Sequence, residues 1–573
     1  MTRTLFRFAI IYFCVLLFRV PAQTPTNAPA PPQTVWKAIT RMVQVNVVVH
    51  ARKGEPVTDL KKEDFAIYDQ GQEQKVESFS MESAQPLMQA GNSKPEPLPP
   101  NTFSNRVELK KATPNAITII LLDGLNSRPE DQASARQQVI KFLNQMQEGD
   151  RVALYALGRE LKVLHDFTTD PAELERALAR HRGHLGTEVA DAEYADSDTG
   201  DALLDQFLNE ASQKLADFQT IRRVETTQAA IEAIANRAAR LPGRKNLIWI
   251  SGGFPMNIGL DGFNVSETQE QRTFTDELER AARAVNSANL AIYPIDTRGL
   301  VGISDNAASN RGTISPRKAA QIPVQSKANR SLQQAHDTME ALAQRTGGKA
   351  YYNTNDIRQA IRSAIDDAKV TYILGYYPTH NNWNGSFHEL KVQVNRKGLD
   401  VRHRNGYFAF ADQSTKPEDR QRALQEAAWS ALEATSLGLT VRAARDYPQP
   451  GKLRVVLLVN TRDISFEQKG DRWTCMLDIL YVQQPAAGQP ASVVTDSLAL
   501  NLTRENYLAI MKEGLLFNKD LNFGDAAYLL RVAVRDAHSG NVGSVNIRPD
   551  RLKPEPPRPM GVPRPSPATE QKK

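Results

Sequence analysis

Apolar residues in this chain gather in short runs that end at polar loops. The run from Ile117 to Leu122 is apolar apart from Thr118 and ends at Asp123. A continuous apolar run is typical of a strand covered on both faces in a parallel sheet. Similar runs occur at residues 151–158, 246–253, 290–296, 349–353 and 371–377. We therefore expect six strands in one mostly parallel sheet.

Segments with helical spacing of apolar residues lie between these runs. They predict helices at residues 129–146, 171–181, 202–241, 267–288, 328–346 and 356–368, the third with a break near residues 222–227. Strands that alternate with helices imply an α/β fold with a doubly wound, mostly parallel sheet.

Strand patterns without helical crossovers flank this region. Residues 43–80 alternate around turns and predict a small β unit, which is too small to be stable alone and is expected to pack on a neighbour. Residues 439–549 contain six strand-like runs separated by turn signals, which predicts an antiparallel β-sandwich of immunoglobulin-like type.

These patterns give the chain eight parts. They are a signal peptide (1–22), a Pro/Ala linker (23–36), the small β unit (37–85), a linker (86–113), the α/β domain with a C-terminal β extension (114–411), a helical connector (416–437), the β-sandwich (438–550) and a disordered Pro-rich basic tail (551–573).

The first residues predict export. Arg3 and Arg7 precede an apolar run from Phe8 to Phe18, and small residues follow near Ala22. This pattern is typical of a cleaved secretory signal, although an uncleaved anchor stays open as an alternative. We expect a periplasmic or secreted protein that contacts a membrane only through this segment, if it is uncleaved.

Composition narrows the range of partners. Lys and Arg (71) nearly balance Asp and Glu (65), the net charge is +6, and no basic stripe with interleaved aromatic residues occurs, so nucleic acid is not an expected partner. The histidine pair His181 and His184 lacks a zinc-binding context and is interpreted as a surface feature.

The first candidate for function is Asp123, which would lie at the carboxyl edge of the predicted sheet, where α/β folds bind their ligands. Strand ends reading LLDGLNS, WISGGFP and YPIDTRG together resemble a von Willebrand factor A (vWA) domain. The patterns at residues 56–79 and 372–410 resemble the exported vWA-related proteins of Acidobacteria.

The resemblance implies a Mg²⁺ or Mn²⁺ site that a partner carboxylate completes. Asp123 and Ser127 match the first and last positions of its Asp-x-Ser-x-Ser motif, but Leu125 replaces the middle serine. Thr226 or Thr227 would supply the threonine. Ser251 and Gly252 stand where the motif's second aspartate is expected.

The resemblance thus predicts a weak, degenerate metal site of Asp123, Ser127 and Thr226. In a structural alternative, Asp123 caps the helix that begins near Pro129 or bonds to the loop of Ser251 to Gly253.

The predicted function is protein–protein interaction or adhesion through the loop edge, without catalysis. The edge residues expected to contact a protein partner are Asn126, Thr227, Ser251, Gly252 and Asp296. A cell-envelope scaffold without metal is one alternative. A hydrolase that uses Ser251 is another, although Trp249 stands where a nucleophile elbow requires glycine.

Overall fold

The structure is a computed structural model, and it describes the central and C-terminal parts of the chain with gaps. The described residues are 42–52, 54–83, 98–106, 116–181, 202–241, 243–253, 281, 284–299, 322–380, 382–409, 417–445, 451–485, 491–523, 527–549 and 552. The predicted signal peptide, the first linker, His184 and the basic tail apart from Leu552 lie outside them. Among the described residues, no helix has the length and apolar character needed to cross a membrane.

One sheet has the predicted parallel character. Its strands are β6 (Ala116–Asp123), β7 (Val152–Leu157), β8 (Leu161–Thr168), β9 (Arg244–Ser251) and β10 (Leu290–Asp296). Their spatial order is β10-β9-β6-β7-β8, and every pairing is parallel except that of β8 with β7. The apolar run that ends at Asp123 is therefore the central strand, as the sequence predicts.

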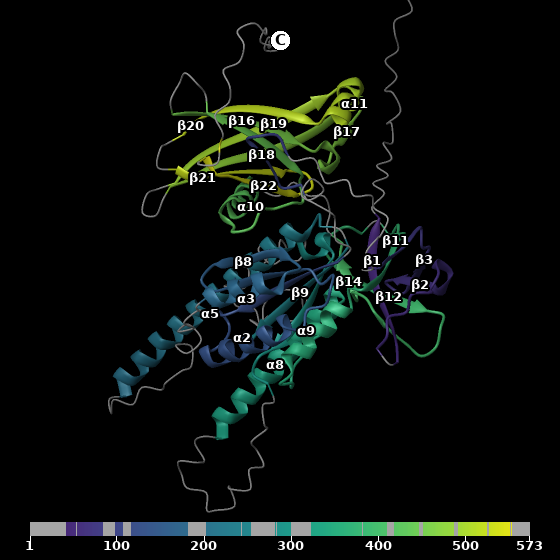
Figure 1. The fold of residues 1–573 in the computed structure, drawn as a ribbon, viewed down its shortest axis with the longest axis vertical. Coiled ribbons are helices and arrows are strands. Elements are labelled where there is room, and N and C mark those ends of the chain that lie inside the picture. The colour runs from purple at the N-terminus through teal and green to yellow at the C-terminus, as the bar shows by residue number, and fades with distance from the viewer. Residues whose placement is uncertain are drawn as a thin grey trace, which may run out of the picture. The chain divides into compact units, whose positions relative to one another are not determined.

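Helices cover both faces of this sheet (Figure 1). They are α2 (Pro129–Leu143), α3 (Pro171–Arg180), α5 (Ala202–Ala238), α8 (Ile322–Thr346) and α9 (Ile357–Asp366). Because side chains alternate along a strand, Ile119 of β6 packs with α5 and α8, while Ile120 packs with α2, α3 and α9. This is the doubly wound α/β fold that the alternating pattern predicts.

Three details of this domain differ from the sequence prediction. The edge strand β8 was not expected, and its exposed, weakly alternating side chains explain why. The expected strand at residues 349–353 is reduced to one bridge, between Tyr351 and Ile295. Helix α5 runs without the break expected near residues 222–227.

The small N-terminal β unit and the C-terminal β extension form a single structure. One sheet has the order β13-β1-β11-β4 and the other β14-β12-β2-β3. The strands are β1 (Val43–Ala51), β2 (Phe65–Asp69), β3 (Gln72–Gln74), β4 (Ser78–Ser83), β11 (Val370–Tyr376), β12 (Phe387–Val394), β13 (Leu399–Arg402) and β14 (Gly406–Phe408), and the short helix η1 (Lys62–Asp64) precedes β2. Both sheets contribute to one hydrophobic core, so we call this structure the first sandwich.

The position of β11 corrects the prediction that residues 371–377 form a strand of the parallel sheet. In the structure β11 lies between β1 and β4 and is antiparallel to both. A central strand of a sandwich is buried as deeply as a central parallel strand, so apolar content alone does not distinguish them. The small β unit does pack on a neighbour, as expected, and the two segments share their strands.

A buried ion pair joins the α/β domain to the first sandwich. Arg402 of β13 donates to both carboxylate oxygens of Asp367, which follows α9, at 2.5 and 2.7 Å. The hydroxyl of Tyr293 in β10 donates to the same carboxylate at 3.0 Å. Asp367 is only 3% exposed, so its charge depends on these partners.

The C-terminal region contains two antiparallel sheets with a common core, which we call the second sandwich. Its strands are β5 (Thr102–Ser104), β15 (Leu439–Arg445), β16 (Lys452–Val459), β17 (Glu467–Lys469), β18 (Arg472–Pro485), β19 (Ser492–Leu502), β20 (Leu515–Asn522), β21 (Ala527–Asp536) and β22 (Val542–Ile547), with helices α10 (Pro417–Trp429), η6 (Thr461–Asp463) and α11 (Arg504–Glu513). All six predicted strands are present, while β20 and α11 were not expected.

Two segments around the second sandwich differ from prediction. Part of the expected linker 86–113 forms β5, which pairs with β15. Asn105 fixes this segment because its side chain donates to the carbonyls of Ala434 and Leu437 and accepts from the amide of Leu439. The expected helical connector ends at Trp429, earlier than residue 437.

We expect Arg402→Met to lower the free energy of unfolding by about 3–5 kcal/mol, because it leaves the buried Asp367 carboxylate without its cation. The double variant Arg402→Met/Asp367→Asn should be less destabilised than the single variant. Arg396→Met, which breaks an exposed pair with Asp59, is the control and should have no measurable effect. Equal losses in all three variants, measured by urea denaturation, would contradict this role.

Candidate functional site at the sheet edge

The sheet has a topological switch point between β6 and β9, because β6 is followed by its neighbour β7 on one side and β9 by its neighbour β10 on the other. From β6 the chain passes to α2 on one face of the sheet, and after β9 it reaches residues 285–288 on the other face. Loops that leave neighbouring strands in opposite directions open a crevice at the carboxyl ends of those strands. Asp123 ends β6 and Ser251 ends β9, so both lie at this point.

The carboxylate of Asp123 is buried and accepts four hydrogen bonds. Its Oδ1 accepts from the amide of Asn126 at 3.0 Å. Its Oδ2 accepts from Asn126 Nδ2, Trp249 Nε1 and Ser251 Oγ, each at 2.9 Å. Burial raises the pKa of Asp123, and these hydrogen bonds partly oppose that shift. Asp123 thus reaches the predicted edge, but its carboxylate does not face solvent.

Asn126 connects this carboxylate to helix α5. Its Nδ2 also donates to Thr227 Oγ1 at 3.0 Å, and the Thr227 hydroxyl in turn donates to the carbonyl of Arg223. Thr226 does not join the network, because its hydroxyl donates to the carbonyl of Arg222 in a partly exposed position. An amide nitrogen therefore lies between Asp123 and the threonine.

The glycines after β9 allow the two loops to touch. The amide of Gly252 donates to Ser127 Oγ at 2.7 Å. A Cβ on Gly252 would lie 3.3 Å from Ser127 Cα, and a Cβ on Gly253 would lie 2.8 Å from the carbonyl oxygen of Asn126. A side chain at position 253 would therefore require the Asn126 backbone to move, whereas a side chain at position 252 would be tightly packed.

These residues do not fit the Mg²⁺ or Mn²⁺ site that the family resemblance implies. Mg²⁺ requires near-octahedral oxygen ligands, usually with one or two carboxylates. Here protein donors take up both oxygens of the one carboxylate, and Ser127 Oγ accepts from the Gly252 amide. Thr226 points elsewhere. Of the structural alternatives, Asp123 bonds to Ser251 of the neighbouring loop, and α2 has no side-chain cap.

Asp296 at the end of β10 forms a second polar group beside this network. It accepts from the amide and guanidinium of Arg298 and lies 3.1 Å from His336 Nε2. The His336 ring stacks on Tyr352 with 4.3 Å between centroids. The backbone amide of Thr297 donates to the carbonyl of Ser251, which holds the two groups side by side.

An open groove of ≈ 1340 Å³ lies next to these loops. The Asp123–Ser127 loop, helix α2 and the β7–β8 hairpin contribute to its lining, in which Arg136, Arg159 and Lys162 are basic and Glu160 and the buried Asp123 are acidic. His181 also lines the groove, and burial lowers the pKa of its imidazole. Arg136 is fixed there by donating to the carbonyl of His181 at 2.9 Å.

The structure brings most of the predicted edge residues together. Hydrogen bonds join Asp123, Asn126, Thr227 and Ser251, and a separate bond joins Ser127 to Gly252. The sequence did not indicate the contacts of Trp249 and His336. Trp249 sits in an apolar strand, where its indole nitrogen gives no separate signal, and His336 lies on a helix forty residues from Asp296.

Two neighbouring threonines provide a test of this network. Thr227→Val should lower the free energy of unfolding by about 1–3 kcal/mol, because it leaves one hydrogen of the buried Asn126 amide unpaired. Thr226→Val removes a partly exposed hydroxyl that bonds only within its own helix, so we expect a much smaller change. Chemical denaturation of both variants would contradict the network if Thr226→Val cost as much as Thr227→Val.

Neither a protein-family model nor a curated protein matches this chain. Among solved structures, it is similar to an aerotolerance-related membrane protein from Bacteroides fragilis, with 15% identity, 44% of this chain and 98% of that chain covered, and a TM-score of 0.22. It is also similar to the von Willebrand factor domain of the pilus tip protein Mfa5 from Porphyromonas gingivalis (13% identity, 44% and 97% covered, TM-score 0.25). A third similar structure is a von Willebrand factor type A protein from Catenulispora acidiphila, with 11% identity, 56% of this chain and 71% of that chain covered, and a TM-score of 0.24.

Proposed function

We propose that this chain is an exported protein-interaction or adhesion module whose α/β domain, of vWA type, binds an acidic segment of a protein partner at its loop edge. The observation that carries the proposal is the groove beside the Asp123 loop, where basic side chains outnumber acidic ones. In this proposal a partner carboxylate is bound by arginine and lysine in place of a metal ion.

Charge and position support the groove as the binding surface. Arg159 and Lys162 are exposed on the β7–β8 hairpin, and Glu160 between them lies 3.4 Å from the Lys162 ammonium. Arg136 adds a fixed positive charge from α2. Carboxylate groups pair well with such cations, and a guanidinium can bind both oxygens of one carboxylate.

The hydrogen-bond network supplies a rigid wall for this groove. Asp123, Gly124 and Ser127 line it, and the contacts of Asp123 and Ser127 with the β9 loop fix their positions. A preformed surface loses little conformational entropy on binding, which favours recognition.

The burial of Ser251 supports a role without catalysis. Its hydroxyl is buried and lies between Asp123 Oδ2 at 2.9 Å and the carbonyl of Gly253 at 2.5 Å. A nucleophilic serine needs access to substrate.

We further propose that the second sandwich is an immunoglobulin-like spacer. Its antiparallel sheets, with the orders β20-β16-β15-β5 and β17-β18-β21-β22 and with β19 paired to β18, support that type.

A cell-envelope scaffold is the second candidate function. The four hydrogen bonds of Asp123 favour it, because bonds within the protein can stabilise this edge whether or not a partner binds. The two functions differ in whether the groove binds acidic peptides.

The test uses fluorescence anisotropy with a labelled peptide of ten glutamates and the purified chain at low salt. We expect Arg159→Glu/Lys162→Glu to weaken binding at least about fivefold, because it reverses two charges in the groove, and added salt to weaken wild-type binding.

The matched control is Arg504→Glu/Lys512→Glu, which reverses two exposed charges on α11 and should leave binding unchanged. Equal weakening by both double variants would show attraction to net charge alone and would reject the groove. Absence of binding by the wild type would favour the scaffold.

A further inference from the structure

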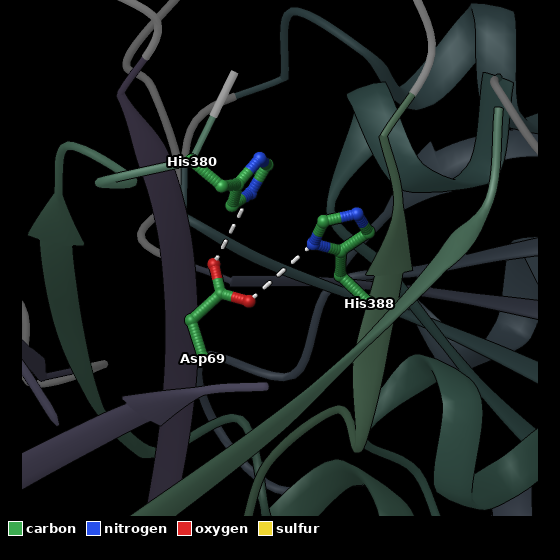
Figure 2. Close-up of side chains that lie close together, drawn as sticks. All are labelled: Asp69, His380 and His388. Carbon is green, nitrogen blue, oxygen red and sulfur yellow. Dashed lines mark ion pairs between the residues drawn. The ribbon is translucent and has the colours of Figure 1, made fainter. Parts of the chain in front are cut away.

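Two histidines and an aspartate converge inside the first sandwich, far from the Asp123 edge in sequence. Figure 2 shows Asp69, His380 and His388 with their polar atoms directed toward one another. Asp69 ends β2, and His388 lies in the neighbouring strand β12, where Leu390 is the register partner of Asp69. His380 follows β11. One ligand atom from each residue lies within 4.8 Å of the others.

Burial makes this cluster costly unless something binds it. Asp69 is 2% exposed and His388 is 5% exposed. Asp69 Oδ1 and His388 Nδ1 are buried without a hydrogen-bond partner, and they face each other at 3.5 Å. Unpaired polar atoms in a protein interior cost about 1–3 kcal/mol each, so these two atoms would be stabilised by a ligand that binds both.

Two tyrosines orient the carboxylate. Tyr376 and Tyr407 donate their hydroxyl hydrogens to Asp69 Oδ2 at 2.8 and 2.9 Å. Both bonds fall on one oxygen, which leaves Oδ1 directed at His388. Hydrogen bonds of this kind from outside the coordination sphere are common around carboxylate ligands of metal ions.

We propose that Asp69, His380 Nε2 and His388 Nδ1 bind a divalent transition-metal ion, for which Zn²⁺ is the best fit. Asp69 Oδ2 lies 3.6 Å from His380 Nε2, and Asp69 Oδ1 lies 3.5 Å from His388 Nδ1. Zn–N and Zn–O bonds of about 2.0–2.1 Å in a tetrahedron place neighbouring ligand atoms about 3.3–3.4 Å apart. The three ligand atoms lie within 4.8 Å of one another, so the two histidine side chains must move closer to coordinate one ion.

The ligand types select the ion. Imidazole nitrogen suits Zn²⁺ and related transition metals, whereas Mg²⁺ and Ca²⁺ prefer oxygen alone. Three protein ligands leave a fourth position for water or another group. His380 is the accessible ligand, with a side chain 21% exposed, so it lies on the side from which an ion would enter.

Binding changes two existing contacts of His380. Its Nε2 lies 2.7 Å from the Tyr407 hydroxyl, and that nitrogen must lose its proton to coordinate the ion. The proton then sits on Nδ1, where the Asn382 amide now donates at 3.2 Å, so this long, exposed contact must open. The ion would link β2 to two residues more than 300 positions later in the chain.

The experiment is calorimetric titration of ZnCl₂ into the untagged full chain. We expect one ion per chain and a loss of affinity of at least about a hundredfold in His388→Ala and in His380→Gln. Tyr407→Phe should weaken binding about tenfold, because it removes an orienting bond without removing a ligand. His165→Ala, which changes a histidine of the α/β domain near Glu173, should bind as wild type does.

A second measurement keeps the test independent of folding. His380→Gln alters a partly exposed side chain, and its far-ultraviolet circular dichroism should match that of the wild type. Co²⁺ bound at the site should give a visible absorption band in the wild type and in His165→Ala, and no band in His380→Gln. Failure of the wild type to bind Zn²⁺, or equal binding by a folded His380→Gln variant, would overturn the proposal.

Discussion

The buried carboxylate of Asp123 is the group on which the loop edge of this protein depends. It ends the central strand of the parallel sheet, and it needs four donors because it is buried. Those donors come from its own loop and from β9. Hydrogen bonds to this one carboxylate therefore fix the two loops that meet at the switch point of the sheet.

This arrangement gives the edge a different chemistry from a metal-dependent one. Asn126 Nδ2 donates to both Asp123 and Thr227, so an amide nitrogen bridges acceptors that a cation would otherwise bridge. Ser251 places a hydroxyl donor where a second carboxylate would add repulsion. The edge side chains are thus bonded to one another, and the neighbouring groove is lined by the basic side chains Arg136, Arg159 and Lys162.

The sequence was enough to predict the α/β fold and the place of Asp123. Continuous apolar runs that alternate with helical segments are typical of strands in a parallel sheet, and Asp123 directly follows one of these runs. It was not enough to predict the partners of β11, since pairing across 300 residues leaves no local pattern. The first sandwich therefore appeared as two separate parts. The same limitation hid Asp69 and its two histidines, which become neighbours only when those parts pair.

The direct test of the central claim is calorimetric titration of Mg²⁺ into the wild type and into Asp123→Asn. If protein donors satisfy Asp123, the two proteins should give the same heats, with no binding that depends on this residue. Saturable Mg²⁺ binding by the wild type that disappears in a folded Asp123→Asn variant would contradict the account.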